Sequence, residues 1–513
     1  MGTCQEGNGK DGSREDPGAR GRGGEPEGRP GEDHGSGREA GLRTGRESER
    51  GTGPESGRSG GPAGAPPPAP RAAPPVPGAW PVAGHALSMM RSPLDFVTSL
   101  AAHGDVVRLR LGPLPVHAVT HPELVQRVLV DDARHFERGR LFEKAALFFG
   151  GGVGTVSGAA HVKQRRTLQP AFQRGKVADY TPLVREAVEE AVARWRPGQV
   201  LPVTDVMNDL SFAMLTNTLF TVGFTREAAA AVQRSVPVLL RGAMVRTILP
   251  EWWTRLPTPG NRRFTRAIDD MGEAVDGAIA AYRGEGKDHG DLLSMLLALR
   301  DENGAGLTDR QIHDQVINFA IAGIETTGAT LAWLFHELGR DPEAEARVHE
   351  ELDTVLGGRP PRHEDLPALK FTGRVVMEVL RLYAVWMFTR RTLAPVRLGD
   401  VVIPAGGEVL YSPYALHHDA RWFPAPDTFD PDRWLTARSA ALPKGAFIPF
   451  GAGAHKCIGN TYAFTEALVA AAVICQRWRL CPIPGTRVRK TATIDVHPDH
   501  LPMTVEPREP ATR

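Results

Sequence analysis

Hydrophobic residues are distributed very unevenly along this chain. Residues 1–72 consist almost entirely of Gly, Arg, Glu, Pro and Ser, with scarcely an aliphatic side chain. Such a segment cannot bury enough apolar surface to offset the entropy lost on folding. From Pro74 onward the hydrophobic content rises. We therefore expect a disordered tail over residues 1–72, one folded domain over residues 73–508 and a short C-terminal tail over residues 509–513.

Alternating apolar and polar positions predict a small β-rich region. Residues 106–111 and 116–119 alternate on either side of a Gly-Pro-Leu-Pro turn, which is typical of a β-hairpin, and a helix over residues 122–130 follows. Residues 396–411 are strand-like and contain a Pro-Ala-Gly-Gly turn. Residues 136–155 carry four phenylalanines among glycines. We expect this last segment to be a mobile apolar loop that lines a pocket.

Helical periodicity dominates the rest of the chain. Residues 178–300 read as amphipathic helices interrupted by a Pro-Thr-Pro-Gly segment. A long central helix is predicted from Thr308, where Thr308 and Gln311 match a capping box, to residue 338. At 1.5 Å per residue it would be about 45 Å long and would cross the whole domain. Its middle, residues 322–328, contains two glycines and two threonines, and we expect the helix to open there and to admit a hydroxyl group and water.

Composition and charge narrow the class of protein. The chain has 513 residues and a net charge of +1, which gives no reason to expect nucleic acid or an acidic substrate. It contains no signal-peptide core and no apolar run near the ~20 residues that span a bilayer. Three of its four cysteines, Cys4, Cys475 and Cys481, lack metal-ligand surroundings and indicate a reducing compartment. We expect a soluble, cytoplasmic bacterial protein without a membrane anchor.

The fourth cysteine, Cys457, is the strongest candidate for chemistry. It lies in a glycine-rich loop, in which Gly451 and Gly453 permit a tight turn close to a flat group and Gly459 permits close packing of the next helix. That helix, predicted over residues 460–478, directs its positive end toward the sulfur and favours the thiolate, which is the form that binds metal. One thiolate suits haem iron, because zinc needs several closely spaced ligands and haem c needs Cys-x-x-Cys-His. A buried structural cysteine in a turn is the alternative.

The loop resembles the haem-binding loop of the cytochrome P450 family. Six positions carry the resemblance: Phe450, Gly451, Gly453, His455, Cys457 and Gly459. The resemblance extends over about residues 74–508. It implies a mainly α-helical fold with a large helical domain and a smaller β-rich subdomain. It also implies haem b as cofactor, Cys457 as the axial ligand of its iron, and monooxygenation with O2.

The resemblance assigns further residues to the cofactor. His161 and Arg165 stand one helical turn apart, and in the family this spacing binds the haem propionates; a solvated basic face is the alternative reading. Arg391 stands where the family supplies another propionate ligand. Ala322 belongs to the part of the central helix that faces the haem.

Two further groups match the family pattern. Glu325 and Thr326 resemble the acid–alcohol pair that delivers protons during oxygen activation. Glu378, Arg381 and Arg433 resemble a buried network that supports the cysteine loop, although the Glu378–Arg381 spacing alone is that of a common surface pair. The sequence departs from the family where Ala384-Val385 replaces the usual prolines, so the shape of the following segment is not predicted.

The sequence also predicts partners. No flavin- or iron–sulfur-binding segment is recognisable, so the resemblance implies electrons from a ferredoxin and a ferredoxin reductase. We expect the ferredoxin to dock where Lys444, Lys456 and Arg374 supply positive charge.

Apolar segments and the likeness to actinobacterial terpene-tailoring enzymes indicate a hydrocarbon substrate, a terpene and specifically a sesquiterpene. The apolar segments are residues 142–149, 385–388 and 501–503.

Several alternatives remain open at the level of sequence. A fatty-acid hydroxylase would need an anchor for the carboxylate, for which Arg140 is the candidate. A peroxygenase or a non-enzymatic haem-thiolate sensor would not need the pair Glu325–Thr326. Terpene cyclisation is raised by the acidic residues Asp269, Asp270 and Glu273, although acidic pairs on helices are usually a solvated face.

Overall fold

The computed structural model describes residues 71–508 except 222–223, 250 and 301–303. The chain divides into two compact units, Met1–Pro68 and Ala69–Arg513, and the described residues all belong to the second. The tails expected over residues 1–72 and 509–513 therefore lie almost wholly outside the described residues. The described fold starts slightly before residue 73, because Arg71 donates its backbone N–H to the Asp400 carbonyl (2.8 Å) and Ala73 is buried.

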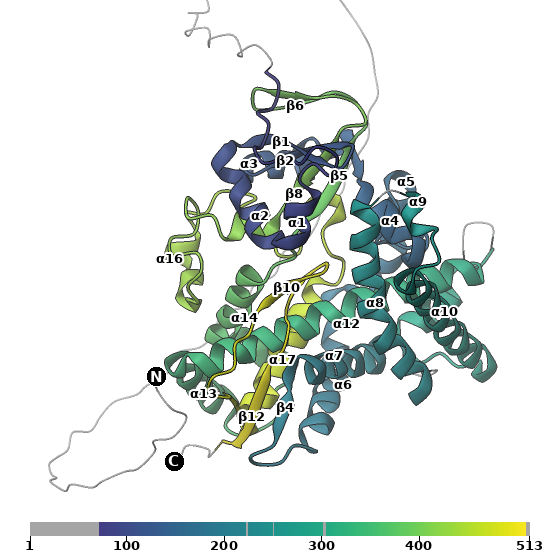
Figure 1. Ribbon diagram of the computed structural model, residues 1–513. Coiled ribbons are helices and arrows are strands. Elements are labelled where there is room, and N and C mark those ends of the chain that lie inside the picture. The colour runs from purple at the N-terminus through teal and green to yellow at the C-terminus, as the bar shows by residue number, and fades with distance from the viewer. Residues whose placement is uncertain (1–70, 222–223, 250, 301–303, 509–513) are drawn as a thin grey trace, which may run out of the picture. The chain divides into compact units, whose positions relative to one another are not determined.

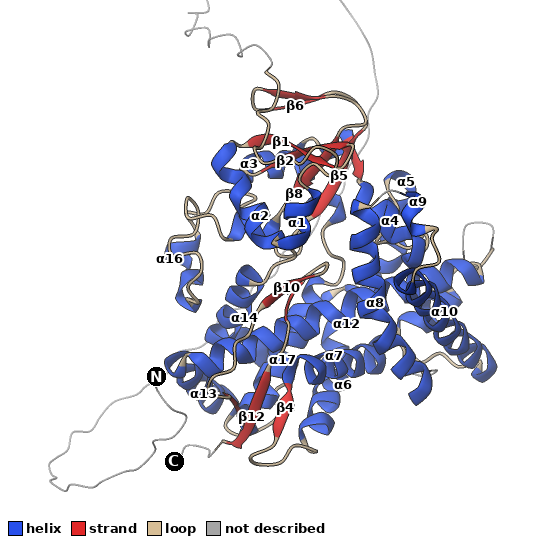
Figure 2. Ribbon diagram, viewed as in Figure 1, coloured by secondary structure: helices blue, strands red, loops and turns tan. Residues whose placement is uncertain are grey.

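Helices make up most of the described structure, and the strands are gathered in a few small sheets (Figures 1 and 2). This arrangement confirms the predicted mainly α-helical fold with a smaller β-rich part. The helices are α1 (Ala86–Arg91), α2 (Pro93–Ser99), α3 (Pro122–Gln126), α4 (Arg140–Phe149), α5 (Gly158–Leu168), α6 (Arg174–Val192), α7 (Val203–Leu219), α8 (Arg226–Ile248), α9 (Glu251–Thr254), α10 (Pro259–Glu285), α11 (Leu292–Ala298), α12 (Asp309–Arg340), α13 (Pro342–Leu356), α14 (Lys370–Leu382), α15 (Pro413–His417), α16 (Thr436–Ser439) and α17 (Asn460–Arg477).

The largest sheet has five strands in the order β1-β2-β8-β5-β3, and only β2 and β8 pair in parallel. A three-stranded sheet has the order β4-β12-β9, and two hairpins pair β6 with β7 and β10 with β11. The strands are β1 (Val106–Leu111), β2 (Leu114–Val119), β3 (Phe136–Arg138), β4 (Val200–Pro202), β5 (Phe388–Thr392), β6 (Val396–Leu398), β7 (Val401–Ile403), β8 (Glu408–Tyr411), β9 (Trp478–Pro482), β10 (Lys490–Ala492), β11 (Val496–Pro498) and β12 (Pro502–Pro507).

The predicted β1–β2 hairpin is present, with a tighter turn than expected. Leu111 pairs with Leu114, so only Gly112 and Pro113 connect the strands. Gly112 has a φ of 60°, a conformation that glycine adopts without the cost borne by other residues. The predicted strand of residues 396–411 is divided into β6, β7 and β8.

The prediction of a loop over residues 136–155 is wrong for its central part. Residues 140–149 form α4, which buries Leu141, Ala145 and Phe148 at helical spacing. The glycines that suggested a loop lie outside this run, at Gly139 before the helix and Gly150 after it. The intervening ten residues contain no helix breaker, and tertiary packing of one apolar face completes the helix.

The long central helix is confirmed as α12, and Thr308 and Gln311 form the predicted capping box. The helix is uninterrupted across residues 322–328, so the local opening expected there is not observed. Its glycines instead allow close packing against α7. A Cβ on Gly323 would stand 2.8 Å from Leu215 Cδ1, and a Cβ on Gly328 would stand 2.1 Å from Asn208 Oδ1.

None of the helices in the described part of the chain combines the length and the apolar character needed to cross a membrane.

Candidate active site

A cavity of about 390 Å³ brings together most of the chemistry predicted from the sequence. Its wall includes Cys457 and its loop on one side and Ala322, Glu325 and Thr326 of α12 on another. Helices α4, α5, α7, α8 and α17 and strand β5 supply the rest. Segments more than 300 residues apart in the chain thus meet at one site.

The Cys457 loop is held by backbone hydrogen bonds and by one indispensable glycine. The Cys457 N–H donates to the Phe450 carbonyl (2.9 Å), and the Lys456 N–H donates to the Gly453 carbonyl (3.1 Å). Gly453 has a φ of 67°, and a Cβ there would stand 1.9 Å from the Leu129 carbonyl oxygen. Gly459 is under no such pressure, because a Cβ there would meet Phe172 at an ordinary 3.7 Å.

Cys457 lines the cavity. Some of its surroundings raise the pKa of its thiol and others lower it. Burial raises the pKa of the thiol, while the Gly459 N–H, Arg165 and Lys456 act to lower the same pKa. The balance is a raised pKa, so the helix N-terminus does not by itself maintain a thiolate as expected. A bound metal ion would remove the proton, because a coordinating thiol is deprotonated.

A cluster of five basic side chains lines the cavity beside the cysteine loop; we call Arg138, His161, Arg165, Arg390 and His455 the basic cluster. The rings of His161 and His455 lie 4.1 Å apart. Burial, followed by the nearby Arg138, lowers the pKa of His161 to about 4, and burial together with Arg138 and Arg390 lowers that of His455 as well. Both imidazoles are therefore neutral at pH 7 and can act as hydrogen-bond donors.

The basic cluster contains Arg390 where Arg391 was predicted. Arg391 is not among the described residues that line the cavity; it pairs with Glu143 (2.6 Å) and Glu408 (3.5 Å). Neighbouring residues of a strand point to opposite faces of the sheet. On β5 this places Phe388 and Arg390 at the cavity and Arg391 on the other face, so the one-residue assignment was wrong.

The basic cluster fits a cofactor that carries two carboxylates. In the described part of the chain, the guanidinium groups of Arg138, Arg165 and Arg390 take part in no ion pair, and His455 Nδ1 is buried without a hydrogen-bond partner. Buried charges of one sign require a counter-charge. The haem propionates would supply it, and Cys457, which lines the same cavity, would supply the single thiolate ligand.

Glu325 and Thr326 of α12 also line the cavity. Thr326 donates its hydroxyl to the Ala322 carbonyl (2.7 Å), one turn earlier. Glu325 is 7% exposed. Burial, followed by the Asp495 carboxylate, raises the pKa of Glu325 well above its ordinary value. A carboxyl group whose pKa is raised in this way holds its proton to a higher pH than an exposed one and can donate it.

The structure brings Glu378, Arg381 and Arg433 into one buried network. Arg381 makes a bidentate contact with Glu378 (2.7 and 3.0 Å), and Arg433 Nε donates to Glu378 Oε1 (3.3 Å). Glu378 and Arg381 are completely buried. Arg381 also donates to the His417 carbonyl, and the His417 ring accepts the N–H of Ile448 at the start of the cysteine loop. The network is thus connected to the loop through His417.

The segments predicted to contact the substrate fall into two groups. Phe142, Phe149, Val385 and Phe388 line the cavity as expected. Residues 501–503 do not: Leu501 directly precedes β12, and Pro502 and Met503 are the first residues of that strand in its three-stranded sheet. Asp495 and its neighbour Ile494, which precede β11, occupy the cavity wall instead.

The acidic residues considered for terpene cyclisation lie on α10. Asp269 and Glu273 are exposed and Asp270 is half-buried. They do not belong to the described residues that line the cavity. They occupy a solvated face of the helix. The acidic pair therefore gives no support for a terpene cyclisation site.

Three residues of the cavity carry chemistry that the sequence motifs did not indicate: Arg138, Glu466 and Asp495. Burial raises the pKa of Glu466 to about 8, and Thr327 donates its hydroxyl to this carboxyl group (3.4 Å). Strand alternation offers a signal for Arg390, since Phe388 two residues earlier is apolar. No local pattern distinguishes Arg138, Glu466 and Asp495 from surface residues.

The cysteine loop, the basic cluster and the pair Glu325 and Thr326 of α12 thus line one cavity, which is the arrangement expected of a haem-thiolate protein. The family model described as Cytochrome P450 matches residues 74–497. The chain therefore belongs to the cytochrome P450 family and is a cytochrome P450 monooxygenase with haem b as its cofactor. When bound, this cofactor supplies the activation of O2 and the transfer of one oxygen atom to the substrate.

The chain is similar to three Streptomyces enzymes over most of its length. It is 44% identical to cyclooctat-9-en-7-ol 5-monooxygenase of Streptomyces melanosporofaciens, over 84% of this chain and 95% of that protein. Cyclooctatin synthase of the same organism is 43% identical over the same shares. Pentalenene oxygenase of Streptomyces avermitilis is 41% identical over 85% of this chain and 97% of its own.

A solved structure supports the fold. The crystal structure of cytochrome P450DA heme domain matches with a TM-score of 0.77 and 26% identity, and it covers 87% of this chain and 100% of that one.

Proposed function

We propose that this monooxygenase hydroxylates a cyclic terpene hydrocarbon, with a sesquiterpene as the first candidate, using O2 and electrons from a ferredoxin and ferredoxin reductase. The observation that carries the proposal is the apolar wall of the cavity. Helices α4, α7 and α8 contribute Leu, Phe and Ala side chains to it, namely Leu141, Phe142, Ala145, Phe149, Leu215, Leu219, Leu240 and Ala243. Such a wall selects by shape and cannot anchor a charged substrate.

The similar enzymes support the same substrate class. Two carry pentalenene and cyclooctat-9-en-7-ol in their names, which denote an unsaturated hydrocarbon and an unsaturated alcohol. Such substrates offer at most one hydroxyl group for hydrogen bonding.

The structure provides no support for a fatty-acid anchor at Arg140. The Arg140 guanidinium donates to the Thr247 carbonyl (3.2 Å), and Arg140 does not belong to the described residues that line the cavity. The cationic groups that do line it belong to the basic cluster and to Lys456, beside the cysteine loop, where we assign them to the cofactor. A fatty acid would therefore have to leave its carboxylate unpaired, at a desolvation cost of several kcal/mol.

We expect cyclic sesquiterpenes to bind and medium-chain fatty acids not to bind. Purified protein is titrated with both, and with cyclooctat-9-en-7-ol, while the shift from low-spin to high-spin haem is followed by absorbance. Products are then identified after turnover with a ferredoxin system. Spin shifts and hydroxylation confined to the fatty acids would refute the terpene proposal. A response only to the larger alcohol would exclude the sesquiterpene.

We assign a role to each group at the site. Cys457 ligates the iron, the basic cluster binds the propionates, and Phe450, Gly451, Gly459 and Ala322 form the surface against the cofactor. Glu325 holds a proton that Thr326 hands to the cavity. The role of Glu325 follows from its burial and the neighbouring Asp495 carboxylate, because both disfavour the charged form and let the carboxyl group keep its proton to a higher pH.

Replacing Thr326 by alanine is expected to separate electron consumption from product formation. Thr326 follows Glu325 on α12 and both residues line the cavity, so removal of the hydroxyl takes away a proton-transfer group and leaves the Leu, Phe and Ala side chains of the wall unchanged. Substrate-induced spin shifts should therefore persist, while product formed per NAD(P)H falls on the order of tenfold or more and peroxide rises. The control is Thr330→Ala, one turn along the helix, where Thr330 bonds the Thr326 carbonyl in the same manner. Equal coupling in both variants and the wild type would exclude the proton-delivery role.

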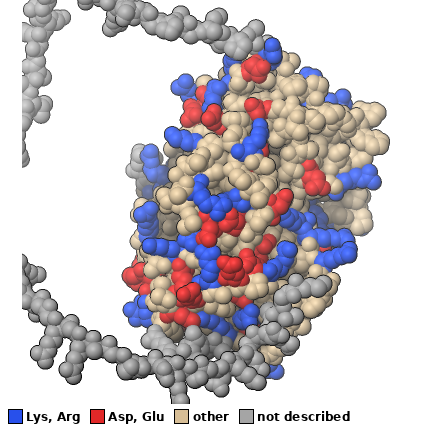
Figure 3. Space-filling view, turned by 90° about the vertical axis from the view of Figure 1, so that its left-hand side faces the viewer, with Lys and Arg blue, Asp and Glu red and all other residues tan. Residues whose placement is uncertain are grey.

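The surface proposed for the ferredoxin is smaller than the sequence indicated. Lys444 and Lys456 are exposed. Arg374, in contrast, is paired with Asp432 (3.1 Å) and half-buried. Figure 3 shows basic and acidic side chains interspersed over the face that carries α13 and α16, without a large field of one sign. Lys444, which precedes the cysteine loop, and Lys456, which lies within it, remain the candidates for docking.

A further inference from the structure

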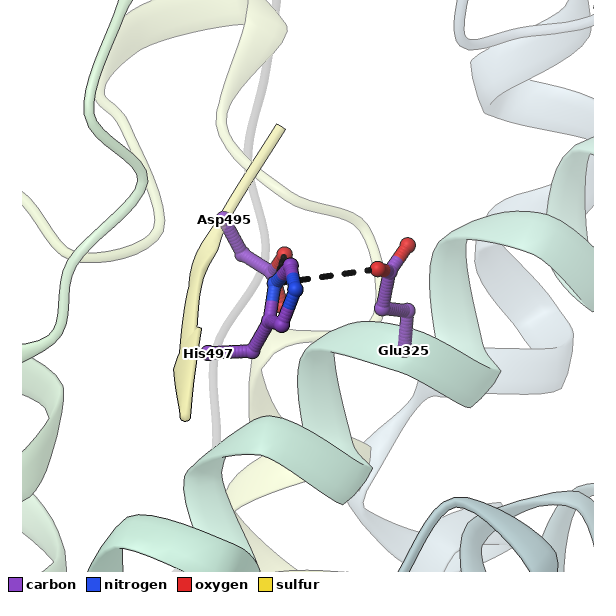
Figure 4. Close-up of side chains that lie close together, drawn as sticks. All are labelled: Glu325, Asp495 and His497. Carbon is purple, nitrogen blue, oxygen red and sulfur yellow. Dashed lines mark ion pairs between the residues drawn. The ribbon is translucent and has the colours of Figure 1, made fainter. Parts of the chain in front are cut away.

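Three polar side chains, Thr493, Asp495 and His497, surround the Glu325 carboxyl group, and none of the three belongs to a recognised motif. Thr493, Asp495 and His497 come from the hairpin of β10 and β11, across from α12. Figure 4 shows Glu325 extending from α12 toward the strand that carries Asp495 and His497. One ligand atom each of Glu325, Asp495 and His497 lies within 4.8 Å of the others.

The Thr493 hydroxyl is the centre of this cluster. Its Oγ1 lies 3.2 Å from Asp495 Oδ1, 3.4 Å from Glu325 Oε1 and 3.5 Å from His497 Nδ1. A hydroxyl group donates one hydrogen bond and accepts two. Thr493 can therefore accept the N–H of His497 while it donates its single proton either to Asp495 or, by rotation of the hydroxyl, to Glu325. This geometry is that of a relay.

The two ends of the cluster differ in their access to water. The side chain of His497 is 18% exposed, whereas those of Asp495 and Glu325 are 6% and 9% exposed. Glu325 and Asp495 line the cavity and His497 is outside the described residues that do. Glu325 Oε2 and Asp495 Oδ2 are buried without a hydrogen-bond partner in the described structure. Protons taken up at His497 thus have a path inward that ends on a carboxyl oxygen free to pass them on.

The hairpin is held in place by two tryptophans. The Trp333 indole N–H donates to the Val496 carbonyl (2.8 Å), and the Trp386 indole N–H donates to the Thr493 carbonyl (2.6 Å). Both indoles are almost completely buried. Because these bonds engage the backbone of the hairpin, they position Thr493 without occupying its hydroxyl.

We propose that the β10–β11 hairpin supplies protons to Glu325, with His497 as the group that takes them up from water and the Thr493 hydroxyl as the group that transfers them. The imidazolium of His497 gives its Nδ1 proton to Thr493 Oγ1 while Thr493 gives its own proton to Glu325 Oε1. The neutral imidazole then recovers one proton from water. Each cycle moves one proton from water to Glu325 and leaves the relay unchanged. The inference rests on the proposed role of Glu325 and Thr326.

Other charged groups face Glu325 and must be distinguished from the relay. Arg241 of α8 acts to lower the pKa of Glu325, opposing Asp495. A second cavity, of about 290 Å³, also reaches Glu325 from between α7 and α8, and its wall includes Asp205, Asp209 and Arg234. No hydrogen bond from that wall to Glu325 is among those of the described residues, and Asp209 is bonded to Gln233 (2.8 Å). The hairpin therefore offers the continuous hydrogen-bonded path.

The test compares Thr493→Val and His497→Gln with Thr493→Ser, Asp209→Asn and Glu325→Gln. Each variant is first shown to bind haem and to respond to substrate. We expect Thr493→Val and His497→Gln to lower product formed per NAD(P)H on the order of tenfold and to raise the solvent isotope effect on product formation. Thr493→Ser should restore both, because it retains the hydroxyl, and Asp209→Asn should resemble the wild type. A purely structural role would not change the isotope effect.

A second measurement does not depend on turnover. The pKa of Glu325 is raised in the folded protein, so its ionisation disfavours the folded state as pH rises above the ordinary value of 4.5. The melting temperature of Glu325→Gln, relative to that of the wild type, should accordingly increase as pH rises. Asp495→Asn removes the neighbouring negative charge. The difference in melting temperature between Asp495→Asn and the double variant Asp495→Asn/Glu325→Gln should therefore increase less with pH than the difference between the wild type and Glu325→Gln.

The outcomes separate the two proposals. Normal coupling in Glu325→Gln would overturn the proton-delivery role itself. Uncoupling in Glu325→Gln with normal coupling in Thr493→Val and His497→Gln would overturn the relay alone. Uncoupling in Asp209→Asn instead of the hairpin variants would assign proton entry to the second cavity and would likewise overturn the relay. If the pH-dependent stabilisation by Glu325→Gln were the same with and without Asp495→Asn, the hairpin would not act on Glu325.

Discussion

Replacing Cys457 by alanine is expected to abolish product formation and the red-shifted Soret band of the reduced carbonyl adduct. That band reports thiolate ligation, and Cys457 is the cysteine that lines the cavity. Cys457→His should also lose it, because imidazole is a neutral ligand and lacks the electron donation of a thiolate. The measurement is the carbonyl difference spectrum of purified protein, together with its haem content and circular dichroism.

Cys475→Ala is the matched control for this experiment. Cys475 is buried in α17 and is not among the described residues that line the cavity. This variant should keep the band and the activity, apart from a modest loss of stability from the missing sulfur. If Cys457→Ala were to retain the red-shifted band, another residue would have to be the ligand.

Replacing Glu378 by glutamine is expected to cost about 3–5 kcal/mol of folding free energy, the largest effect on stability that we predict. Glu378 is completely buried and accepts hydrogen bonds from Arg381, Arg433 and the Trp434 indole N–H. The substitution leaves two buried guanidinium groups without their carboxylate. Because the network also contacts His417 and through it the cysteine loop, haem retention should fall along with the melting temperature.

The same substitution at an exposed ion pair provides the control. Glu190 and Arg194 are one helical turn apart on α6, and both side chains are at least 70% exposed. Solvent screens such a pair, so Glu190→Gln should change stability by less than about 0.5 kcal/mol. Denaturant unfolding of both variants, with haem content measured in parallel, checks the prediction. Equal stabilities would show that burial of the Glu378 network carries no energetic weight.

Much of the fold was readable from the sequence because its signals are local. The β1–β2 hairpin follows from alternation around Gly112-Pro113, and the start of α12 follows from the capping box of Thr308 and Gln311. The Cys457 loop is equally local, since its tight turn requires glycine at residue 453. The cofactor class and the family follow from this loop alone.

The site as a whole depends on register and packing, which a motif does not contain. Which of Arg390 and Arg391 faces the cavity is decided by the phase of β5 within its sheet, and a shift of one residue reverses it. The glycines of α12 looked like points of weakness, but α7 packs against them and keeps the helix intact.

The sequence by itself determined the class of protein and predicted the cysteine ligand and the acid–alcohol pair on α12, because each depends on residues close together in the chain. Only the tertiary structure brought Thr493 and His497 to Glu325, more than 160 residues away, and only burial in that setting raises the pKa of the Glu325 carboxyl group. The physical reason is that desolvation and long-range hydrogen bonds are properties of the packed chain and leave no pattern in the order of its residues.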